Sequence, residues 1–334
     1  MPALVWGGLA LTVLSGICSG NSMLPMKFAR RWQWENTWLV FSLFSLLILP
    51  WALAFLLAGN LRSLYCSLLP GQLLLPLILG IAWGVAQVLF GLSIARLGQA
   101  LSFAIVISLG SLGGTLVPLI FKNRAVFGTS NGALILSGLA VMLAGIVLSA
   151  RAGGQREQGV KRESGGGYAM ALALAVLCGL LAPMINYSFV FGQEIAARAV
   201  QLGVSPIRAA YTVWPVTLAG GLLPKLAYCL YLLSKKKTWN VFRGPCLPDA
   251  GFAVLMAVLW MGAVAIYGVA SVCLGVLGTS VGWGLIQILS IMSANIGGLL
   301  AGEWAAAPGS ARRTLYAGLA LLTVATVMLA AGNR

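Results

Sequence analysis

The sequence contains no histidine and only six acidic residues among its 334 positions. The acids lie between long apolar runs or at the ends of such runs: Glu35, Glu157, Glu163, Glu194, Asp249 and Glu303. No nucleophile–base pair, metal-ligand cluster or phosphate-binding loop can be recognised, and catalysis is difficult to build without a histidine or an acid inside the apolar runs. We therefore expect no enzyme, no catalytic residue, no metal and no bound cofactor.

Charged residues make up only 8% of the chain, whereas 60% of the residues are hydrophobic. A soluble domain needs more polar surface than this, so the composition indicates a membrane protein. The net charge of +15 comes from 21 basic residues that lie mostly in short gaps between apolar runs. This pattern is typical of membrane topology rather than of a phosphate-binding face, so we expect contacts with membrane lipid and none with nucleic acid. The six cysteines form no CxxC motif and are interpreted as small buried hydrophobes.

Ten apolar runs are long enough to cross a bilayer, which needs about 20 residues per helix. In chain order these spans 1 to 10 cover residues 4–28, 38–58, 73–95, 99–121, 131–150, 168–191, 208–233, 251–274, 277–301 and 314–333. The first run lacks the basic start of a signal peptide and continues past Pro25 to Lys27, so we interpret it as a retained helix. The predicted fold class is an all-α polytopic membrane protein with ten transmembrane helices.

One repeated motif divides the chain into two halves. Trp83–Gly98 reads WGVAQVLFGLSIARLG and Trp260–Gly275 reads WMGAVAIYGVASVCLG, with the tryptophan, an aromatic–glycine pair and Leu-Gly at identical spacing. A basic, glycine-rich linker over 151–167 separates five spans in 1–150 from five spans in 168–334. Because five is odd, the second half enters the membrane from the opposite side. The sequence therefore predicts two inverted-topology five-helix repeats.

The distribution of positive charge predicts the orientation. Fourteen of the 21 lysines and arginines lie in the gaps after spans 1, 3, 5, 7 and 9, and six lie in the other gaps or at the termini. Positive residues stay on the cytoplasmic side, so we expect an integral protein of a bacterial inner (plasma) membrane with both termini outside and a cytoplasmic linker. The last basic residue, Lys225, lies in span 7 towards its end, where we expect its side chain to snorkel to the interface.

The polar groups that remain inside the spans are amides, hydroxyls and aromatic rings. The candidate substrate-binding residues are Asn21, Trp83, Gln87, Asn186, Tyr211, Trp214, Trp260, Tyr267, Trp283, Gln287, Ser290 and Asn295. Amides and flat aromatic walls suit a neutral polyhydroxylated ligand such as a sugar. The alternative is that the amides join helices and the tryptophans form interfacial belts, and for any one residue both interpretations stay open. For Gln87 and Gln287 we favour the cavity.

Prolines and glycines interrupt several spans. The candidate hinge or gate residues are Pro25, Pro183, Gly110, Gly114 and Gly282, because breakers within long spans are typical of alternating-access transporters. We expect a central cavity lined by spans 1, 3, 4, 6, 8 and 9. Glycines four apart also permit close helix crossings, which we assign first to packing within the fold and second to dimerisation. The expected state is a monomer or a homodimer.

Several motifs occur together along the chain. They are PMKF at 25–28, RWQWENTW at 31–38, LPWA at 49–52, the Trp83–Gly98 stretch, GTL at 114–116 with Pro118, QE at 193–194, LGVSP at 202–206, and Glu303-Trp304 before Arg312-Arg313. In this combination the chain resembles the L-rhamnose–proton symporter family of the drug/metabolite transporter superfamily. The resemblance implies ten helices, termini outside and sugar uptake. The chain departs from the family pattern in having Gln87 in place of an asparagine, and no histidine or acid near 270–282.

These observations predict a secondary active transporter that works by alternating access and moves a neutral sugar or polyol, of L-rhamnose type by the resemblance. Co-transport of a proton stays open, because a proton relay needs a titratable group at membrane depth and every acid lies at the end of a span or outside it. One alternative is a facilitator or exporter of another small metabolite without proton coupling. A ligand-binding membrane receptor is a weaker alternative, since no soluble domain is appended to relay a signal.

Overall fold

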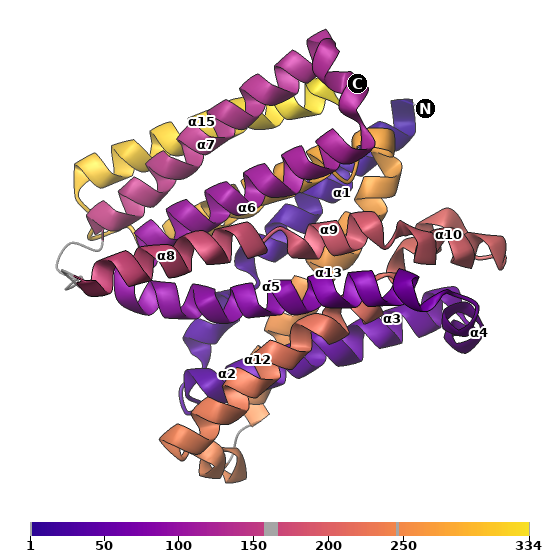
Figure 1. Cartoon of the computed structure of the whole chain (residues 1–334). Helices are drawn as coiled ribbons and strands as arrows, with labels where there is room; N and C mark the ends of the chain where they lie inside the picture. Colours follow the sequence, from indigo (N-terminus) through magenta and orange to yellow (C-terminus); the bar gives the residue numbers. More distant parts are fainter. Residues whose placement is uncertain (1, 157–165, 245–246, 334) are drawn as a thin grey trace.

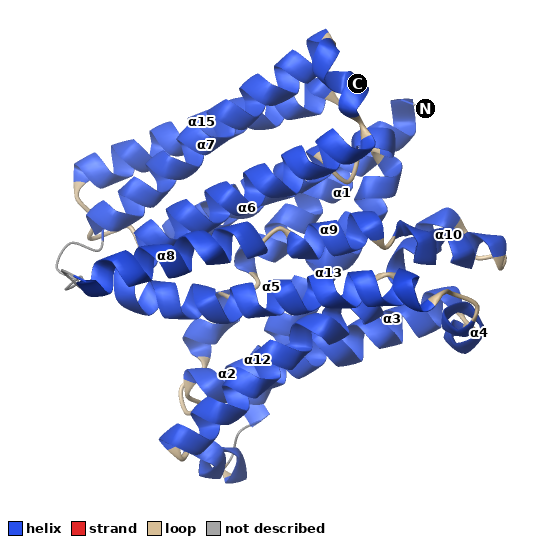
Figure 2. Ribbon diagram, viewed as in Figure 1, coloured by secondary structure: helices blue, strands red, loops and turns tan. Residues whose placement is uncertain are grey.

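The computed structural model describes residues 2–156, 166–244 and 247–333, and within these ranges the chain forms helices and no strand (Figures 1 and 2). Ten helical segments of the described chain are long and apolar enough to cross a membrane. Each overlaps one span predicted from the sequence, with ends that differ by a few residues in most cases. The prediction of an all-α protein with ten membrane-spanning segments is therefore confirmed.

Six spans are single helices: α5 (Pro70–Leu97), α6 (Gln99–Lys122), α7 (Ser130–Arg156), α13 (Leu247–Cys273), α14 (Val281–Leu300) and α15 (Gly309–Gly332).

The other four spans are each made of several helices. Span 1 consists of α1 (Pro2–Asn21) and η1 (Leu24–Phe28), and span 2 of α2 (Trp34–Leu43), η2 (Phe44–Ile48) and α3 (Leu49–Ala58). Span 6 consists of α8 (Gly166–Leu181), α9 (Met184–Phe191) and α10 (Gln193–Gln201), and span 7 of α11 (Pro206–Ala209), η4 (Ala210–Thr212) and α12 (Trp214–Lys236). The connections contain α4 (Leu61–Cys66), η3 (Arg124–Gly128), η5 (Thr238–Arg243) and η6 (Gly275–Leu277).

The expected linker over 151–167 is helical at both of its ends. Helix α7 continues to Arg156, and α8 begins at Gly166. The rest of the linker, including Glu157 and Glu163, lies outside the described residues, as does Cys246. The other five cysteines are free thiols. Cys178 and Cys229 are buried as expected and Cys18 and Cys273 are partly buried, but Cys66 is exposed, so the interpretation as a buried hydrophobe is wrong for Cys66.

Proline accounts for the interruptions in spans 1 and 6. Pro25 lies in the first turn of η1, and Pro183 directly precedes α9. Proline has no N–H to donate and its ring clashes with the preceding turn, so a helix ends or bends where it occurs. Spans 1 and 6 are therefore both broken, at equivalent places in the two halves, and a hinge function for these two breaks stays a prediction.

Each main helix contact has a counterpart in which the helices of the first half are replaced by the corresponding helices of the second half. Helix α1 packs on α13 and α14, whereas α8 packs on α5 and α6. Helix α6 packs on α7, whereas α14 packs on α15. Helix α5 packs on α12, α13 packs on α2, and α7 lies along α15 (Figure 1). This pairing is the one expected if the two five-span halves have the same internal arrangement.

The two halves approach each other closely where α5 crosses α12, and glycine makes this crossing possible. A Cβ atom on Gly84 would run into the backbone of Gly221, and one on Gly80 would run into the backbone of Thr217. Only hydrogen side chains allow two helix backbones to approach this closely. Gly80 and Gly84 therefore serve helix packing within the chain, which is the role that we assigned first to glycines four positions apart.

Candidate functional site

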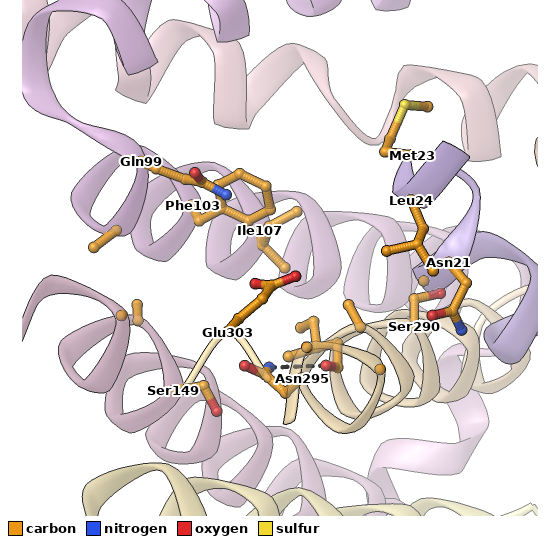
Figure 3. Close-up of a pocket in the computed structure, with 18 of the residues that line it drawn as sticks. Asn21, Met23, Leu24, Gln99, Phe103, Ile107, Ser149, Ser290, Asn295 and Glu303 are labelled. Atoms are coloured by element: carbon orange, nitrogen blue, oxygen red, sulfur yellow. Dashed lines mark hydrogen bonds between the residues drawn. The ribbon is translucent and has the colours of Figure 1, made fainter. Parts of the chain in front are cut away.

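A cavity of about 440 Å³ opens between η1, α6, α7, α14 and the turn that follows α14. Its polar lining includes Asn21, Gln99, Ser149, Gln287, Ser290 and Asn295, and its apolar lining includes Phe103, Ile107 and Trp304. Figure 3 shows the labelled residues around the cavity, among them Gln99 and Phe103 on one helix and Ser290 and Asn295 on another. The volume falls in the range of small-molecule sites, and the mixture of a few polar groups with apolar walls is typical of them.

Two of the serines that line the cavity have unused hydrogen-bonding capacity. The Oγ atoms of Ser149 and Ser290 are buried and have no hydrogen-bond partner within the described part of the chain. A buried hydroxyl without a partner costs free energy unless a ligand or water satisfies it. Both serines belong to the cavity lining, but their Oγ atoms are covered by protein, and that of Ser149 packs against Gly318 of α15. A ligand therefore reaches either hydroxyl only after the side chain rotates towards the cavity.

The amides of the cavity are held by their own helices. The Asn21 Nδ2 atom donates to Ile17 O (2.9 Å) and to Ser293 Oγ (2.6 Å), so it ties the end of α1 to α14. The Asn295 Nδ2 atom donates to Ile291 O (2.9 Å), one turn earlier, as Figure 3 marks. These bonds fix the direction of each amide and leave its oxygen as the free acceptor for a ligand hydroxyl.

An ion cluster lies at the wall of the cavity. Glu303 pairs with Lys27 through its Oε1 atom and with Arg156 through its Oε2 atom, the second at 3.1 Å. The Arg156 guanidinium lies 4.9 Å from the ring centroid of Trp304. The cluster joins η1, α7 and the turn after α14, and it combines two cations with the one acid among the described residues that line the cavity.

Of the twelve substrate-binding candidates, four line this cavity: Asn21, Gln287, Ser290 and Asn295. A second group packs instead into the buried core beside α9. The hydroxyl of Tyr267 lies 2.6 Å from Asn186 Oδ1, and the amide nitrogen of Asn186 donates to Gly114 O at 2.8 Å and to Thr279 O at 3.0 Å. Every hydrogen-bonding group of Asn186 therefore has a protein partner.

Two tryptophans complete this buried group. The Trp283 Nε1 atom donates to Gly110 O at 3.2 Å, and a Cβ on Gly114 would overlap the Trp283 indole. Trp214 stacks on Phe189 with ring centroids 4.6 Å apart. The candidate hinge glycines Gly110 and Gly114 thus pack against other helices, and Gly282 packs beside Leu274 and Tyr267 in the same way.

Trp83 and Trp260, the first residues of the two motif copies, form a third group. Their rings are stacked, with centroids 5.6 Å apart, and the Nζ atom of Lys225 lies 4.5 Å from the Trp83 centroid. The expectation that Lys225 snorkels to the interface is wrong, because this side chain is only 3% exposed. Helices α2, α5 and α13 pack on α12 or on one another around it, so protein and not the membrane interface surrounds the side chain in this conformation.

Gln87 and Tyr211 lie away from the cavity. Gln87 is half-buried on α5 and makes no hydrogen bond within the described residues, and Tyr211 lies in η4 against the large core cluster around Trp214. The cavity is lined by spans 1, 4, 5 and 9, and spans 3, 6 and 8, which we also expected there, contribute nothing to its lining.

Several residues of the cavity were missed by the sequence reasoning. Gln99 and Ser149 lie near helix ends, in spans 4 and 5, and were passed over because attention was on groups deep in the spans. Glu303 and Trp304 were noted only as part of a motif. The motif indicated a resemblance to a family and gave no indication of a cavity.

The whole chain matches one protein family. The model of the L-rhamnose-proton symport protein family covers residues 3–333. The chain belongs to this family. The L-rhamnose-proton symporters of Cronobacter sakazakii and Mannheimia succiniciproducens are 27% and 26% identical to it, over 92% of each chain. An L-rhamnose-proton symporter of Escherichia coli (strain SMS-3-5) is 32% identical over 217 residues, which are 64% of this chain and 63% of that protein.

Membership of the symport protein family confirms the expectation of a transporter rather than an enzyme. Together with the ten apolar helices it makes the chain an integral membrane protein. Two of the motifs that carried the resemblance meet at the cavity: PMKF forms most of η1 and contributes Lys27, and Glu303-Trp304 follows α14. Residues 276 positions apart in the sequence are thereby brought into one ion cluster.

Proposed function

We propose that this protein carries a neutral sugar of the L-rhamnose type, together with a proton, across the inner membrane by alternating access. The observation that carries the proposal is the match of residues 3–333 to the L-rhamnose-proton symport protein family, together with the similarity to the L-rhamnose-proton symporters of Cronobacter sakazakii and Mannheimia succiniciproducens. The proposed substrate site is the cavity between η1, α6, α7 and α14.

The chemistry of the cavity lining supports a sugar. The unpartnered hydroxyls of Ser149 and Ser290 can each donate to and accept from a sugar hydroxyl. Gln287 and the amide oxygen of Asn295 add a donor and acceptors, while the ring of Phe103 offers an apolar face to the C–H groups of a pyranose. The acid of the cavity is already paired with two cations, so a cationic solute would compete with Lys27 and Arg156 for it.

The position of the cavity supports an inward-facing state. It is lined by the ends of α1, α6, α7 and α14 that adjoin the gaps after spans 1, 3, 5 and 9, and these gaps hold most of the positive charge. On the positive-inside rule those ends are cytoplasmic and both termini are outside. The opposite ends of α6 and α14 are closed by the bonds of Asn186, which would then form the outer closure.

The paired helix contacts support an inverted repeat, in which the two halves have opposite orientations and equivalent internal packing. In that arrangement the breaks at Pro25 and Pro183 are equivalent hinges, one next to the open cavity and one next to the closed cluster. Gly110, Gly114 and Gly282 lie at the contacts that must separate when the outer side opens. Lipid would surround the ten spans, and the chain alone contains a complete cavity, as a monomeric transporter requires.

Thermal stabilisation of the purified protein tests the substrate class. A ligand that binds the folded state raises the melting temperature by an amount set by its concentration relative to its Kd. We expect L-rhamnose and related deoxy-sugars to raise it, and sugar acids, nucleosides and amines to leave it unchanged. The Ser149→Ala variant, which removes one unpartnered hydroxyl from the cavity, should need a higher rhamnose concentration for the same shift. Stabilisation by an amine and none by a sugar would overturn the proposed substrate.

A further inference from the structure

Lys225 is the charged residue that lies deepest in the membrane-spanning part of the described chain. It is eleven residues from both ends of α12, about 16 Å along the helix at 1.5 Å per residue. Every other described lysine, arginine, aspartate or glutamate lies in a connection or near an end of its helix. A charge at this depth is costly, and such residues usually have a function in transport.

Four aromatic rings surround the Nζ atom of Lys225. The ring centroids lie at 4.5 Å for Trp83, 5.7 Å for Trp38, 5.7 Å for Phe41 and 5.8 Å for Trp260. All four distances are within the range of a cation–π interaction. We call this group the aromatic cage. Its rings come from α2, α5 and α13, so three helices close around a side chain of α12.

No carboxylate reaches Lys225 within the described residues. The nearest acid on the helices of the cage, Glu35 of α2, is taken by Lys236 Nζ and Thr238 Oγ1, both at 2.9 Å. On α12 itself the next titratable groups are the phenol of Tyr228 and the buried thiol of Cys229, about one turn further along. The lysine also makes no hydrogen bond to another described residue, so the rings are its only partners.

The other two walls of the cage bring no charge to it. The one charged residue of α5 is Arg96, at the end of the helix and 13 positions from Trp83. The one charged residue of α13 is Asp249, in its first turn, where the carboxylate accepts from the backbone N–H groups of residues 30–32. The charge state of Lys225 is therefore set by two opposing effects: ring faces favour the ammonium, and burial favours the neutral amine.

We propose that Lys225 is the residue that carries the proton during transport. A lysine paired with a carboxylate would keep its proton, whereas one held only by rings can give it up when the rings separate or water enters. The neutral amine takes one proton from water on the outer side, the ammonium is enclosed by the cage, and the proton passes to water on the inner side. One N–H bond forms and one breaks in each cycle, and no other reactant is needed.

The composition of the cage links this proton to the movement of the protein. Trp38, Phe41 and Trp83 belong to the first five spans, whereas Lys225 and Trp260 belong to the second five. A movement of one half relative to the other must therefore change the contacts of Lys225. The inference rests on the proposed proton-coupled sugar transport, and it adds the residue through which the proton moves.

Proteoliposomes that contain a pH dye test the inference with two substitutions. Lys225→Arg keeps a permanent positive charge that stacks on aromatic rings but does not release its proton. Lys225→Met keeps the apolar stem without a titratable group. The matched control is Lys235→Met, an exposed lysine on the same helix whose Nζ lies 5.4 Å from the ring centroid of Tyr231. Two signals are recorded: exchange of labelled L-rhamnose at equal pH, and acidification of the lumen when L-rhamnose is added outside.

We expect the wild-type protein and Lys235→Met to give both signals. Lys225→Arg should exchange L-rhamnose at a rate within about threefold of the wild type, because only the loaded carrier needs to move during exchange. Its rate of lumen acidification should be at least about tenfold lower than that of the wild type. Lys225→Met should show no acidification. Acidification by Lys225→Arg at the wild-type ratio of proton to sugar would overturn the inference and leave the proposed function intact. A wild-type protein that exchanges rhamnose without acidification would overturn the proton coupling itself, and this inference with it.

A third variant decides the matter if both Lys225 variants fail to give a monodisperse protein. Phe41→Leu removes one ring of the cage and keeps the lysine. With less attraction for the ammonium, the proton is held less tightly, so the pH of half-maximal acidification should fall by roughly half a unit. An unchanged pH dependence would overturn the role of Lys225.

Discussion

The hydroxyl of Tyr267 on α13 lies 2.6 Å from the Oδ1 atom of Asn186 on α9. The amide nitrogen of Asn186 also donates to the carbonyl oxygens of Gly114 on α6 and Thr279 ahead of α14. One side-chain amide thus connects spans 4, 6 and 8 with the start of span 9. The cavity is lined by the first residues of α6 and the last half of α14, and the cluster lies beyond them along both helices. We propose that it closes the side on which the cavity does not open.

The Tyr267→Phe substitution should weaken this closure. It removes the hydroxyl that donates to Asn186 Oδ1 and, at the longer distance of 3.2 Å, to Thr279 O. The net cost is about 1 kcal/mol, which corresponds to about a fivefold shift towards the open form. The measurement is labelling of a Thr279→Cys protein by a membrane-impermeant maleimide from outside. The Thr279 bond is made by its backbone oxygen, so the new side chain does not disturb it. We expect labelling to increase about fivefold when Tyr267→Phe is added.

Tyr65→Phe is the matched control for that experiment. The Tyr65 hydroxyl donates to Thr212 O at 2.8 Å, outside the Asn186 cluster. Tyr65→Phe should leave the labelling at position 279 unchanged. The background signal, measured on the protein without Thr279→Cys, is subtracted in each case. Equal labelling in Tyr267→Phe and Tyr65→Phe would mean that the Tyr267–Asn186 bond does not hold the outer side closed.

Gly114 should not tolerate a side chain. A methyl group there would overlap the indole of Trp283, and overpacking of this kind costs about 1–3 kcal/mol. We expect Gly114→Ala to lower the melting temperature in detergent, and the smaller ring of Trp283→Phe to restore it in the double variant. Gly91→Ala is the control, because no atom lies within 4 Å of a Cβ at Gly91. A melting temperature for Gly114→Ala equal to that of Gly91→Ala would contradict the packing.

The two unpartnered serines of the cavity should contribute to sugar binding. Removing a neutral hydrogen bond costs about 0.5–1.5 kcal/mol, so Ser149→Ala and Ser290→Ala should each raise the Kd for L-rhamnose by about two- to twelvefold. Since neither hydroxyl has a protein partner, the melting temperature of the unliganded protein should stay the same or rise. Ser137→Ala serves as a control, because its hydroxyl is exposed on α7 and bonds to its own helix. An unchanged Kd in both cavity variants would remove these serines from the site.

Alanine substitutions of Gln287 and Gln87 test whether the substrate binds in this cavity or nearer to α5. Gln287 lines the cavity, whereas Gln87 lies on α5 outside it. Isothermal titration with L-rhamnose should show a larger loss of affinity in Gln287→Ala than in Gln87→Ala. The reverse order would move the site towards α5 and the tryptophans of the repeated motif.

The sequence predicted the membrane architecture well, for a simple physical reason. A helix that crosses a bilayer needs about 20 apolar residues in a row, so each span can be recognised from consecutive residues alone. Pro25 and Pro183 marked the breaks in spans 1 and 6, because proline lacks an N–H and weakens a helix. Proline alone does not decide a break, since Pro76, Pro118 and Pro224 lie inside the continuous helices α5, α6 and α12. The repeated motif indicated that the halves correspond, and the paired helix contacts agree with it.

The site was much harder to predict, because it depends on which helices cross and at what depth. Ser149 on α7 and Gln99 on α6 line the cavity together with residues of α14 that are far away in the sequence. Asn186 was expected to meet a ligand, yet its partners Gly114 and Thr279 are 72 and 93 positions away in the sequence. Lys225 was expected at the interface because a single helix was considered, and the three neighbouring helices that enclose it were not visible in the pattern.

Uptake of labelled L-rhamnose into proteoliposomes with an imposed pH gradient tests the central claim most directly. A gradient of one pH unit, acidic outside, is worth about 1.4 kcal/mol per proton and can support about tenfold accumulation of a sugar that moves with one proton. We expect accumulation approaching that value, and its collapse to simple equilibration when a protonophore dissipates the gradient. Uptake that stops at equal concentrations and ignores the gradient would contradict proton symport, and no uptake of rhamnose at all would contradict the proposed substrate.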